Sequence, residues 1–275
     1  MSNIPVIHIS EDNISRAWEN AVITTWESGI PIKTEYDKPE DPPSRDCTMI
    51  MEIKHPMSEP RIHRAFPAGL EDLEIYRQEV LYGVHDSRVD TGGWWYSYYQ
   101  RLFKYPGRMK TDQIAYIVRK LSQTPYSRRA QAVTWNVDID PAVNEPPCLL
   151  RVWCRIIDDE GPVLNMNTHW RSRDAYKAAF MNVYVMTLLQ QHIAERIGEK
   201  IKRVVRLGRY VDISDSFHIY GSYYEEFKGF LKTLRTRTFE ERTWDTEFAQ
   251  PIFDEAAAKL RKEQQSCEKS LKFQT

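Results

Sequence analysis

Residues 163–198 read VLNMNTHWRSRDAYKAAFMNVYVMTLLQQHIAERIG, and this stretch combines the two patterns that decide the fold. Val163 to Trp170 alternate apolar and polar side chains, which predicts a half-buried strand. Asp174 to Gly198 carry apolar residues on more than one helical face, which predicts a long, largely buried central helix. The apolar series is Ala178, Met181, Val185, Leu188, Leu189, His192 and Ile197.

Helices come first along the chain, and strands follow. Caps and apolar spacing predict helices over residues 10–29, 70–84, 111–121 and 251–265, with a further helix inside 215–234. Alternation predicts strands over 48–53, 130–137, 149–157 and 201–213, and the proline-bearing stretch 33–47 is expected to be a loop. This order favours an α+β fold over regular βα alternation. We expect a single domain over 1–275.

Composition excludes several classes of protein. The chain has 275 residues with 41% hydrophobic content and a net charge of −1, so nothing global favours DNA or a membrane surface. The four cysteines (47, 148, 154, 267) lack CxxC spacing, and the seven histidines lack paired ligand spacing, so we expect reduced thiols and no metal. The first residues show no signal-peptide pattern, and a cytoplasmic protein is expected.

A candidate nucleophile follows two prolines at 146–148 and opens a predicted strand. A free cysteine is more often an inert buried residue, but a nearby guanidinium lowers a thiol pKa and favours the thiolate. Arg171 lies at the far end of a strand–turn–strand unit and can return close to Cys148. Arg171-Ser172 also directly precedes the long helix, where an anion is favoured.

Other polar residues suit a nucleotide, although each has a structural alternative. A buried Asn182 amide matches the N3–H and O4 edge of uracil, and it also suits a protein partner. His218 and Tyr220 point the same way in an extended segment. Glu79 borders an apolar helix face, so it is either a surface group or a buried acid suited to proton transfer. The aromatic stretch 92–100 is either core or a stacking wall.

The ordered set Ser127-Arg128-Arg129, Trp135-Asn136, Pro147-Cys148, Arg171-Ser172-x-Asp174, Asn182 and His218-x-Tyr220 resembles the thymidylate synthase family. The resemblance is strongest from about 112 to 224. It implies a homodimer of α+β subunits with a twisted mixed sheet at the interface. It also implies reductive methylation of dUMP to dTMP, with 5,10-methylenetetrahydrofolate or a related methylene-pterin as cosubstrate.

The resemblance also implies roles for single residues. Cys148 adds to C6 of the pyrimidine, and Glu79 moves protons near O4. The phosphate is held by Arg171 and Ser172, by Arg128 and Arg129 of the partner subunit, and by Arg45 as the best N-terminal candidate. Asn182 reads the base, Asp174 lies between nucleotide and folate, and His218 and Tyr220 hold the ribose. Trp94 or Trp95 packs on the folate. Which of Tyr96, Tyr98 and Tyr99 assists deprotonation at C5 stays open.

The sequence departs from the family pattern beside these motifs. Leu149 replaces the usual His after the cysteine, and Trp170 replaces the usual Gln before the arginine. Ala178 to Met181 replace Gly-Leu-Pro-Phe, and the tail from Trp244 does not resemble the family's closing segment. A pyrimidine nucleotide 5-hydroxymethylase acting on dUMP, CMP or dCMP is therefore the alternative function. A third possible function is that of a non-catalytic nucleotide- or RNA-binding protein. The presence of both Cys148 and Glu79 argues against it, because a protein that only binds needs neither residue.

Overall fold

The computed structural model describes residues 3–107 and 109–272, with side chains through Gln264. Its main sheet has the strand order β1-β3-β9-β7-β6-β5, with β2 paired to β3 and β8 paired to β9. The strands are β1 (Val6–Glu11), β2 (Ile30–Ile32), β3 (Ser44–Ile53), β5 (Gln131–Val133), β6 (Leu149–Asp158), β7 (Pro162–Trp170), β8 (Arg173–Asp174) and β9 (Arg206–Ile219). A small second sheet pairs β4 (Ile62–His63) with β10 (Thr243–Trp244).

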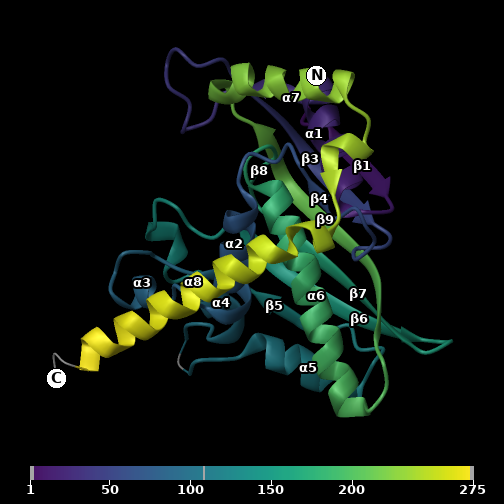
Figure 1. Ribbon diagram of the computed structural model, residues 1–275, viewed down its shortest axis with the longest axis vertical. Coiled ribbons are helices and arrows are strands. Elements are labelled where there is room, and N and C mark those ends of the chain that lie inside the picture. Colours follow the sequence, from purple (N-terminus) through teal and green to yellow (C-terminus); the bar gives the residue numbers. More distant parts are fainter. Residues whose placement is uncertain (1–2, 108, 273–275) are drawn as a thin grey trace.

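The helices include one long central helix, which runs beside the main sheet (Figure 1). They are α1 (Ile14–Ser28), α2 (Leu70–Tyr82), α3 (Ser87–Asp90), α4 (Tyr98–Phe103), α5 (Gln113–Gln123), α6 (Ala179–Ile201), α7 (Tyr224–Thr236) and α8 (Thr246–Lys272). Three 3-10 turns lie at Asp140–Ala142, Gly221–Tyr223 and Glu240–Arg242. The predicted α+β class and the buried central helix are confirmed.

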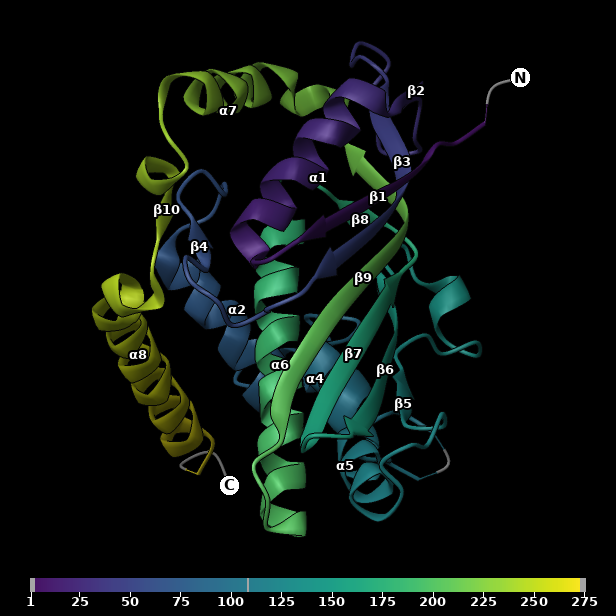
Figure 2. The same ribbon diagram turned by 90° about the vertical axis from the view of Figure 1, so that its right-hand side faces the viewer.

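The sheet is mixed, as expected. β1 pairs with β3 and β7 pairs with β9 in parallel, whereas β3–β9, β5–β6 and β6–β7 are antiparallel. Figure 2 shows α1 and α6 beside the strands. In β7 the side chains alternate between buried and half-buried, so Leu164 and Met166 face the core while Asn165 and Asn167 lie on the opposite face.

Several predicted boundaries were wrong for identifiable reasons. The first helix begins at Ile14, because the Asn13 side chain accepts the backbone N–H of Arg16 and caps it, and Ser10 belongs to β1. The expected loop 33–47 ends early, because β3 begins at Ser44 and pairs with both β2 and β9. The strand expected over 130–137 is only β5, Gln131–Val133.

The central helix begins five residues later than predicted. Asp174 is not helical, because its backbone pairs with β9 opposite His218 and its carboxylate accepts the N–H groups of Tyr176 and Lys177. The strand expected over 201–213 is shifted to 206–219, so that His218 lies inside β9. The C-terminal helix is longer than predicted and begins at Thr246.

Candidate active site

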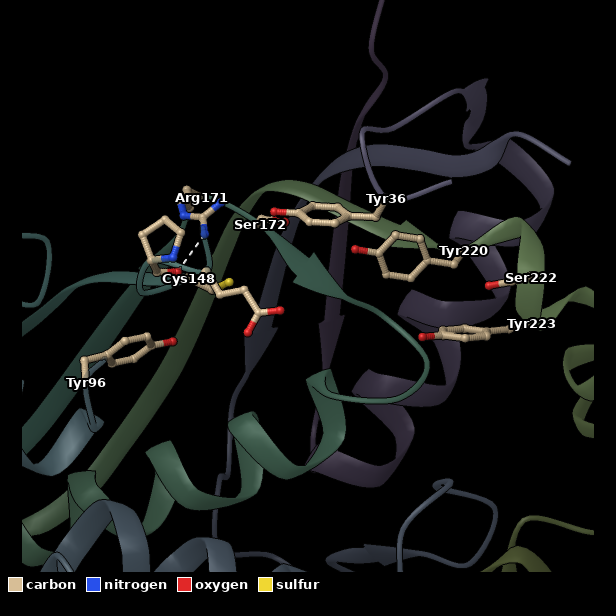
Figure 3. Close-up of a pocket in the computed structure, with 10 residues that line it drawn as sticks. Tyr36, Tyr96, Cys148, Arg171, Ser172, Tyr220, Ser222 and Tyr223 are labelled. Carbon is tan, nitrogen blue, oxygen red and sulfur yellow. Dashed lines mark hydrogen bonds between the residues drawn. The ribbon is translucent and has the colours of Figure 1, made fainter. Parts of the chain in front are cut away.

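Cys148 lies where two cavities meet. The larger has a volume of about 490 Å³, and the smaller, of about 240 Å³, reaches toward α6. Cys148, Ser172 and Tyr220 line both cavities, so the two form adjoining parts of one candidate site. Figure 3 shows the larger cavity, lined by Tyr36, Tyr96, Glu145, Pro146, Cys148, Arg171, Ser172, Tyr220, Ser222 and Tyr223.

Arg171 returns to Cys148 in the way the strand–turn–strand pattern predicted. The antiparallel pairing of β6 and β7 places Leu149 opposite Trp170. The backbone N–H of Arg171 therefore reaches the Cys148 carbonyl, to which it donates at 2.9 Å. The Arg171 guanidinium also donates to the carbonyl oxygens of Pro147 (3.0 Å) and Pro146 (2.7 Å). These bonds hold the cysteine loop against the end of β7.

Two opposing effects act on the half-buried Cys148 thiol. Burial raises its pKa above the ordinary value, and Glu145 raises it further. The positive charges of Arg171 and Arg173 act in the opposite direction without overcoming burial. The thiol is therefore protonated at neutral pH in the free protein, and formation of the thiolate requires a base or a change in surroundings.

The predicted phosphate residues fall into two groups. Arg171 and Ser172 line the larger cavity. Arg45, in β3, donates to the Gly29 carbonyl at 3.0 Å and lines neither cavity, because its strand turns it toward Trp26. Arg128 and Arg129 are solvent-exposed and also lie outside both cavities. A single chain thus brings only part of the predicted set together.

The smaller cavity holds the predicted base and ribose residues. Asn182, His218, Tyr220 and Asp174 all line it. Asn182 extends from α6, is 9% exposed, and its Nδ2 donates to the Tyr76 hydroxyl at 2.7 Å. Tyr220 packs edge-on against His218, with ring centroids 4.6 Å apart.

His218 has a defined hydrogen-bonding direction. It is buried, and burial lowers its pKa to about 4, so the ring is neutral at pH 7. Its Nδ1 lies 3.1 Å from Ser216 Oγ, which donates to Asp46 Oδ2 at 2.7 Å. The Ser216 hydroxyl proton is thus committed to Asp46, so Nδ1 must carry the ring proton. Nε2, which has no protein partner, is then an acceptor suited to a ligand hydroxyl.

Asp174 combines burial with two backbone hydrogen bonds. Burial is the larger effect and raises its pKa to about 6, although the N–H groups of Lys177 and Tyr176 favour the carboxylate. A carboxyl group that titrates near 6 can hold or release a proton under physiological conditions. Asp174 is therefore an acid in the lining of the smaller cavity whose pKa suits proton transfer near neutral pH.

Glu79 and the tryptophan pair lie outside both cavities. Glu79 Oε1 is 2.6 Å from His85 Nδ1, and the two side chains form a half-buried pair on α2 and the turn that follows. The Trp94 ring packs edge-on against His85 at 6.0 Å, and Trp95 is 72% exposed. The aromatic stretch contributes through Tyr96 and Tyr98, whereas Tyr99 stacks on Phe103.

Several cavity residues were not predicted from sequence. Tyr36 and Glu145 come from irregular segments in which no periodic signal exists, and Tyr223 lies in a 3-10 turn. Tyr76 lines neither cavity but accepts from Asn182; it lies in α2 among side chains whose pattern predicts only core packing. Trp170 and Leu149 are both buried, and the Leu149 N–H donates to the Tyr98 hydroxyl at 3.2 Å.

Comparisons with known proteins agree with one another. The profile of the family described as "Thymidylate synthase" matches residues 12–264. A Methanosarcina mazei protein named "Putative thymidylate synthase" is 30% identical over 226 residues, covering 82% of this chain and 95% of that protein. A Methanocaldococcus jannaschii protein of the same name is 31% identical over 218 residues, covering 77% of this chain and 90% of that protein.

A solved structure shares the fold. Thermostable thymidylate synthase A from Bacillus subtilis superimposes with a TM-score of 0.56 at 18% identity, covering 78% of this chain and 83% of that one. Among the residues described here, no helix is both long and apolar enough to cross a membrane.

Proposed function

The chain belongs to the thymidylate synthase family, and we propose that it is a cytoplasmic enzyme that methylates dUMP to dTMP with 5,10-methylenetetrahydrofolate. One observation carries the proposal. Cys148 lies at the junction of two cavities, with Arg171 and Ser172 in the larger and Asn182 and His218 in the smaller. A thiol, an anion site, an amide and a hydroxyl acceptor are the groups that a pyrimidine nucleotide needs.

Residues of this chain take different roles in the proposed reaction. Arg171 and Ser172 bind the phosphate, and the bare Nε2 of His218 accepts a ribose hydroxyl. The Cys148 sulfur loses its proton and bonds to C6, and the C5–C6 electron pair moves toward O4, where the Asn182 amide donates. C5 would then accept the one-carbon unit, whose bond to the cosubstrate nitrogen breaks as the C5 proton leaves. Hydride addition to the exocyclic carbon would expel the Cys148 sulfur from C6 as a thiolate, which regains a proton.

The larger cavity suits a flat cosubstrate. Its walls carry the aromatic rings of Tyr36, Tyr96, Tyr220 and Tyr223, which suit stacking against a heterocycle. Methylenetetrahydrofolate supplies the one-carbon unit and the reducing hydride when it is bound. We assign no step to Glu79, Trp94 or Trp95, because these side chains line neither cavity.

We also propose a homodimer with shared sites. The sheet face opposite α6 carries half-buried Arg151, Trp153 and Asn167, which suits contact with a second sheet. Arg128 and Arg129 are exposed beside β5, so they are free to reach a neighbouring subunit's phosphate.

Hydroxymethylation of the pyrimidine is a second candidate, and one observation favours it. Helix α8 packs along α2, and no described residue after Tyr223 lines either cavity. A site that the C-terminal segment leaves open admits water, and water can quench an exocyclic methylene in place of hydride.

Mass analysis of the products tests these alternatives. The enzyme is incubated with methylenetetrahydrofolate and either dUMP or dCMP. A methyl product from dUMP supports the proposal, and a hydroxymethyl product supports the second candidate.

Two substitutions test the roles of single residues. Cys148→Ala should abolish turnover while nucleotide binding stays measurable, and substantial activity in this variant would contradict the mechanism. Asn182→Asp should shift preference toward cytosine nucleotides, and an unchanged preference removes Asn182 from base reading.

A further inference from the structure

A third cavity of about 390 Å³ lies between α2, α6 and α8, away from Cys148. Figure 1 shows α8 crossing α2 and α6, and α2 and α8 pack directly on each other. None of the residues that line this cavity lines either of the two cavities at Cys148. It is therefore a separate site, built largely by the C-terminal helix.

Arg61 lies at this cavity without an ion pair to any described side chain. The residue is only 2% exposed, and its guanidinium donates from Nη2 to the Thr187 hydroxyl at 3.0 Å and lies over the Tyr184 ring at 4.6 Å. Its Nε is buried and has no partner. Among the residues that the structure describes, no carboxylate comes within ion-pair distance of it. A buried cation in this state is costly unless an anion is supplied from outside.

The neighbouring acids are already committed to other groups. Both oxygens of Glu74 accept from Arg77 at 2.6 Å, and Oε1 also accepts from Gln78. Asp254 accepts from Gln250. Glu59, just before Arg61, accepts the backbone N–H groups of Arg61 and Thr246. The charge of Glu59 acts on Arg61, but none of these carboxylates accepts a hydrogen bond from the guanidinium, so the buried Nε is left for a ligand.

A second unpartnered donor lies at the same cavity. Thr246 is the first residue of α8, and its buried Oγ1 has no hydrogen-bond partner. The backbone N–H of Thr246, by contrast, already donates to Glu59, so the hydroxyl is the group left for a ligand. Apolar groups from Met57, Leu188, Phe253 and Ala257 line the rest of the cavity, whose size is in the range of small-molecule sites.

We propose that this cavity binds a small organic anion, whose phosphate or carboxylate head contacts Arg61 and Thr246 and whose apolar part contacts α6 and α8. Arg77, which is paired with Glu74, and the exposed Arg261 also line the cavity, so three arginines face the carboxylates of Glu74 and Asp254, with Glu59 beside Arg61. Guanidinium and hydroxyl donors together suit an oxyanion.

Calorimetric titration with inorganic phosphate tests the site. The buffer lacks phosphate and sulfate, and saturating dUMP fills the cavity at Cys148. We expect the wild-type protein to bind one phosphate. Arg61→Met should weaken this binding about 10- to 100-fold and Thr246→Val about 3- to 10-fold, as loss of a charged and a neutral hydrogen bond predicts. Arg235→Met, which changes an exposed arginine of α7, should bind as the wild type does.

Succinate is titrated in the same way to compare a carboxylate with a phosphate. The anion that binds more tightly identifies the preferred head group. The proposal is overturned if neither anion binds, or if folded Arg61→Met binds phosphate as tightly as the wild type. Circular dichroism shows whether Arg61→Met folds; if it does not, unchanged affinity in Thr246→Val overturns the proposal. Should dUMP fail to bind at all, the wild type is expected to take up two phosphates and Arg61→Met one, so failure of the proposed function is distinguishable.

Discussion

Replacing Arg173 by Met should strongly destabilise the fold behind Cys148. Arg173 and Asp212 are both fully buried, and Nη2 donates to Oδ2 at 2.5 Å. The Asp212 carboxylate also accepts from the hydroxyls of Tyr210 (2.7 Å) and Thr168 (3.0 Å). These neutral donors remain in Arg173→Met, but the carboxylate loses the one cation that pairs with it among the described residues, and an uncompensated buried charge costs roughly 3–5 kcal/mol.

The chain offers a matched control. Arg203 donates to both oxygens of Asp158, at 2.7 and 3.0 Å, but the Arg203 side chain is 52% exposed. Arg203→Met removes an ion pair of similar geometry that is exposed to solvent, so it should cost less than about 1 kcal/mol. The difference between the two variants isolates the effect of burial.

Urea unfolding at one protein concentration measures both changes. Adding Asp212→Asn to Arg173→Met should recover part of the loss. A loss no larger than that of Arg203→Met would refute this reasoning.

Three further perturbations test the site. Cys148 should react slowly with iodoacetamide at neutral pH and faster as pH rises, because burial raises its pKa; Arg171→Gln should slow the reaction, and a faster rate would contradict the assigned effect. Asp174→Asn should gain stability over the parent between pH about 4 and about 6, where the unfolded parent ionises before the folded one; a gap that is constant with pH would contradict this. Tyr76→Phe leaves an Asn182 N–H unpaired and should raise KM for dUMP about 10-fold, or 1.4 kcal/mol, with Cys148 alkylation unchanged; an unchanged KM would contradict it.

The sequence predicted the parts of the fold that have a strong period. The alternation of 163–170 and the apolar faces of the central helix identified β7 and α6 because both elements bury a regular set of side chains. β1 was missed because it is defined by pairing with the distant β3; the predicted helix took in its last two residues, and Val6 to Ile9 were left unassigned. Asp174 was placed in the helix because pairing with β9 is a tertiary contact that no local pattern shows.

Prediction of the arrangement around Cys148 succeeded where consecutive strands determine it. Arg171 returns to Cys148 because β6 and β7 are antiparallel, which the turn at 158–161 already indicated. It was weaker where tertiary packing decides the direction of a side chain. Arg45 turns to Gly29 and Glu79 to His85, and neither partner is visible as a pattern in the sequence. Tyr36 comes from an irregular loop, where periodicity gives no information.

The two apolar substitutions beside the motif now have a structural consequence. Leu149 and Trp170 are buried, and the Trp170 indole N–H donates to Thr168 Oγ1 at 3.2 Å, so neither side chain donates a hydrogen bond to the Asn182 amide. Asn182 instead contacts the hydroxyl of Tyr76. A hydroxyl both donates and accepts, so Tyr76 is compatible with either orientation of the amide. If Asn182 reads the base as proposed, we expect the Tyr76–Asn182 pair to influence the choice between uracil and cytosine, because the orientation of the amide decides which edge faces the base.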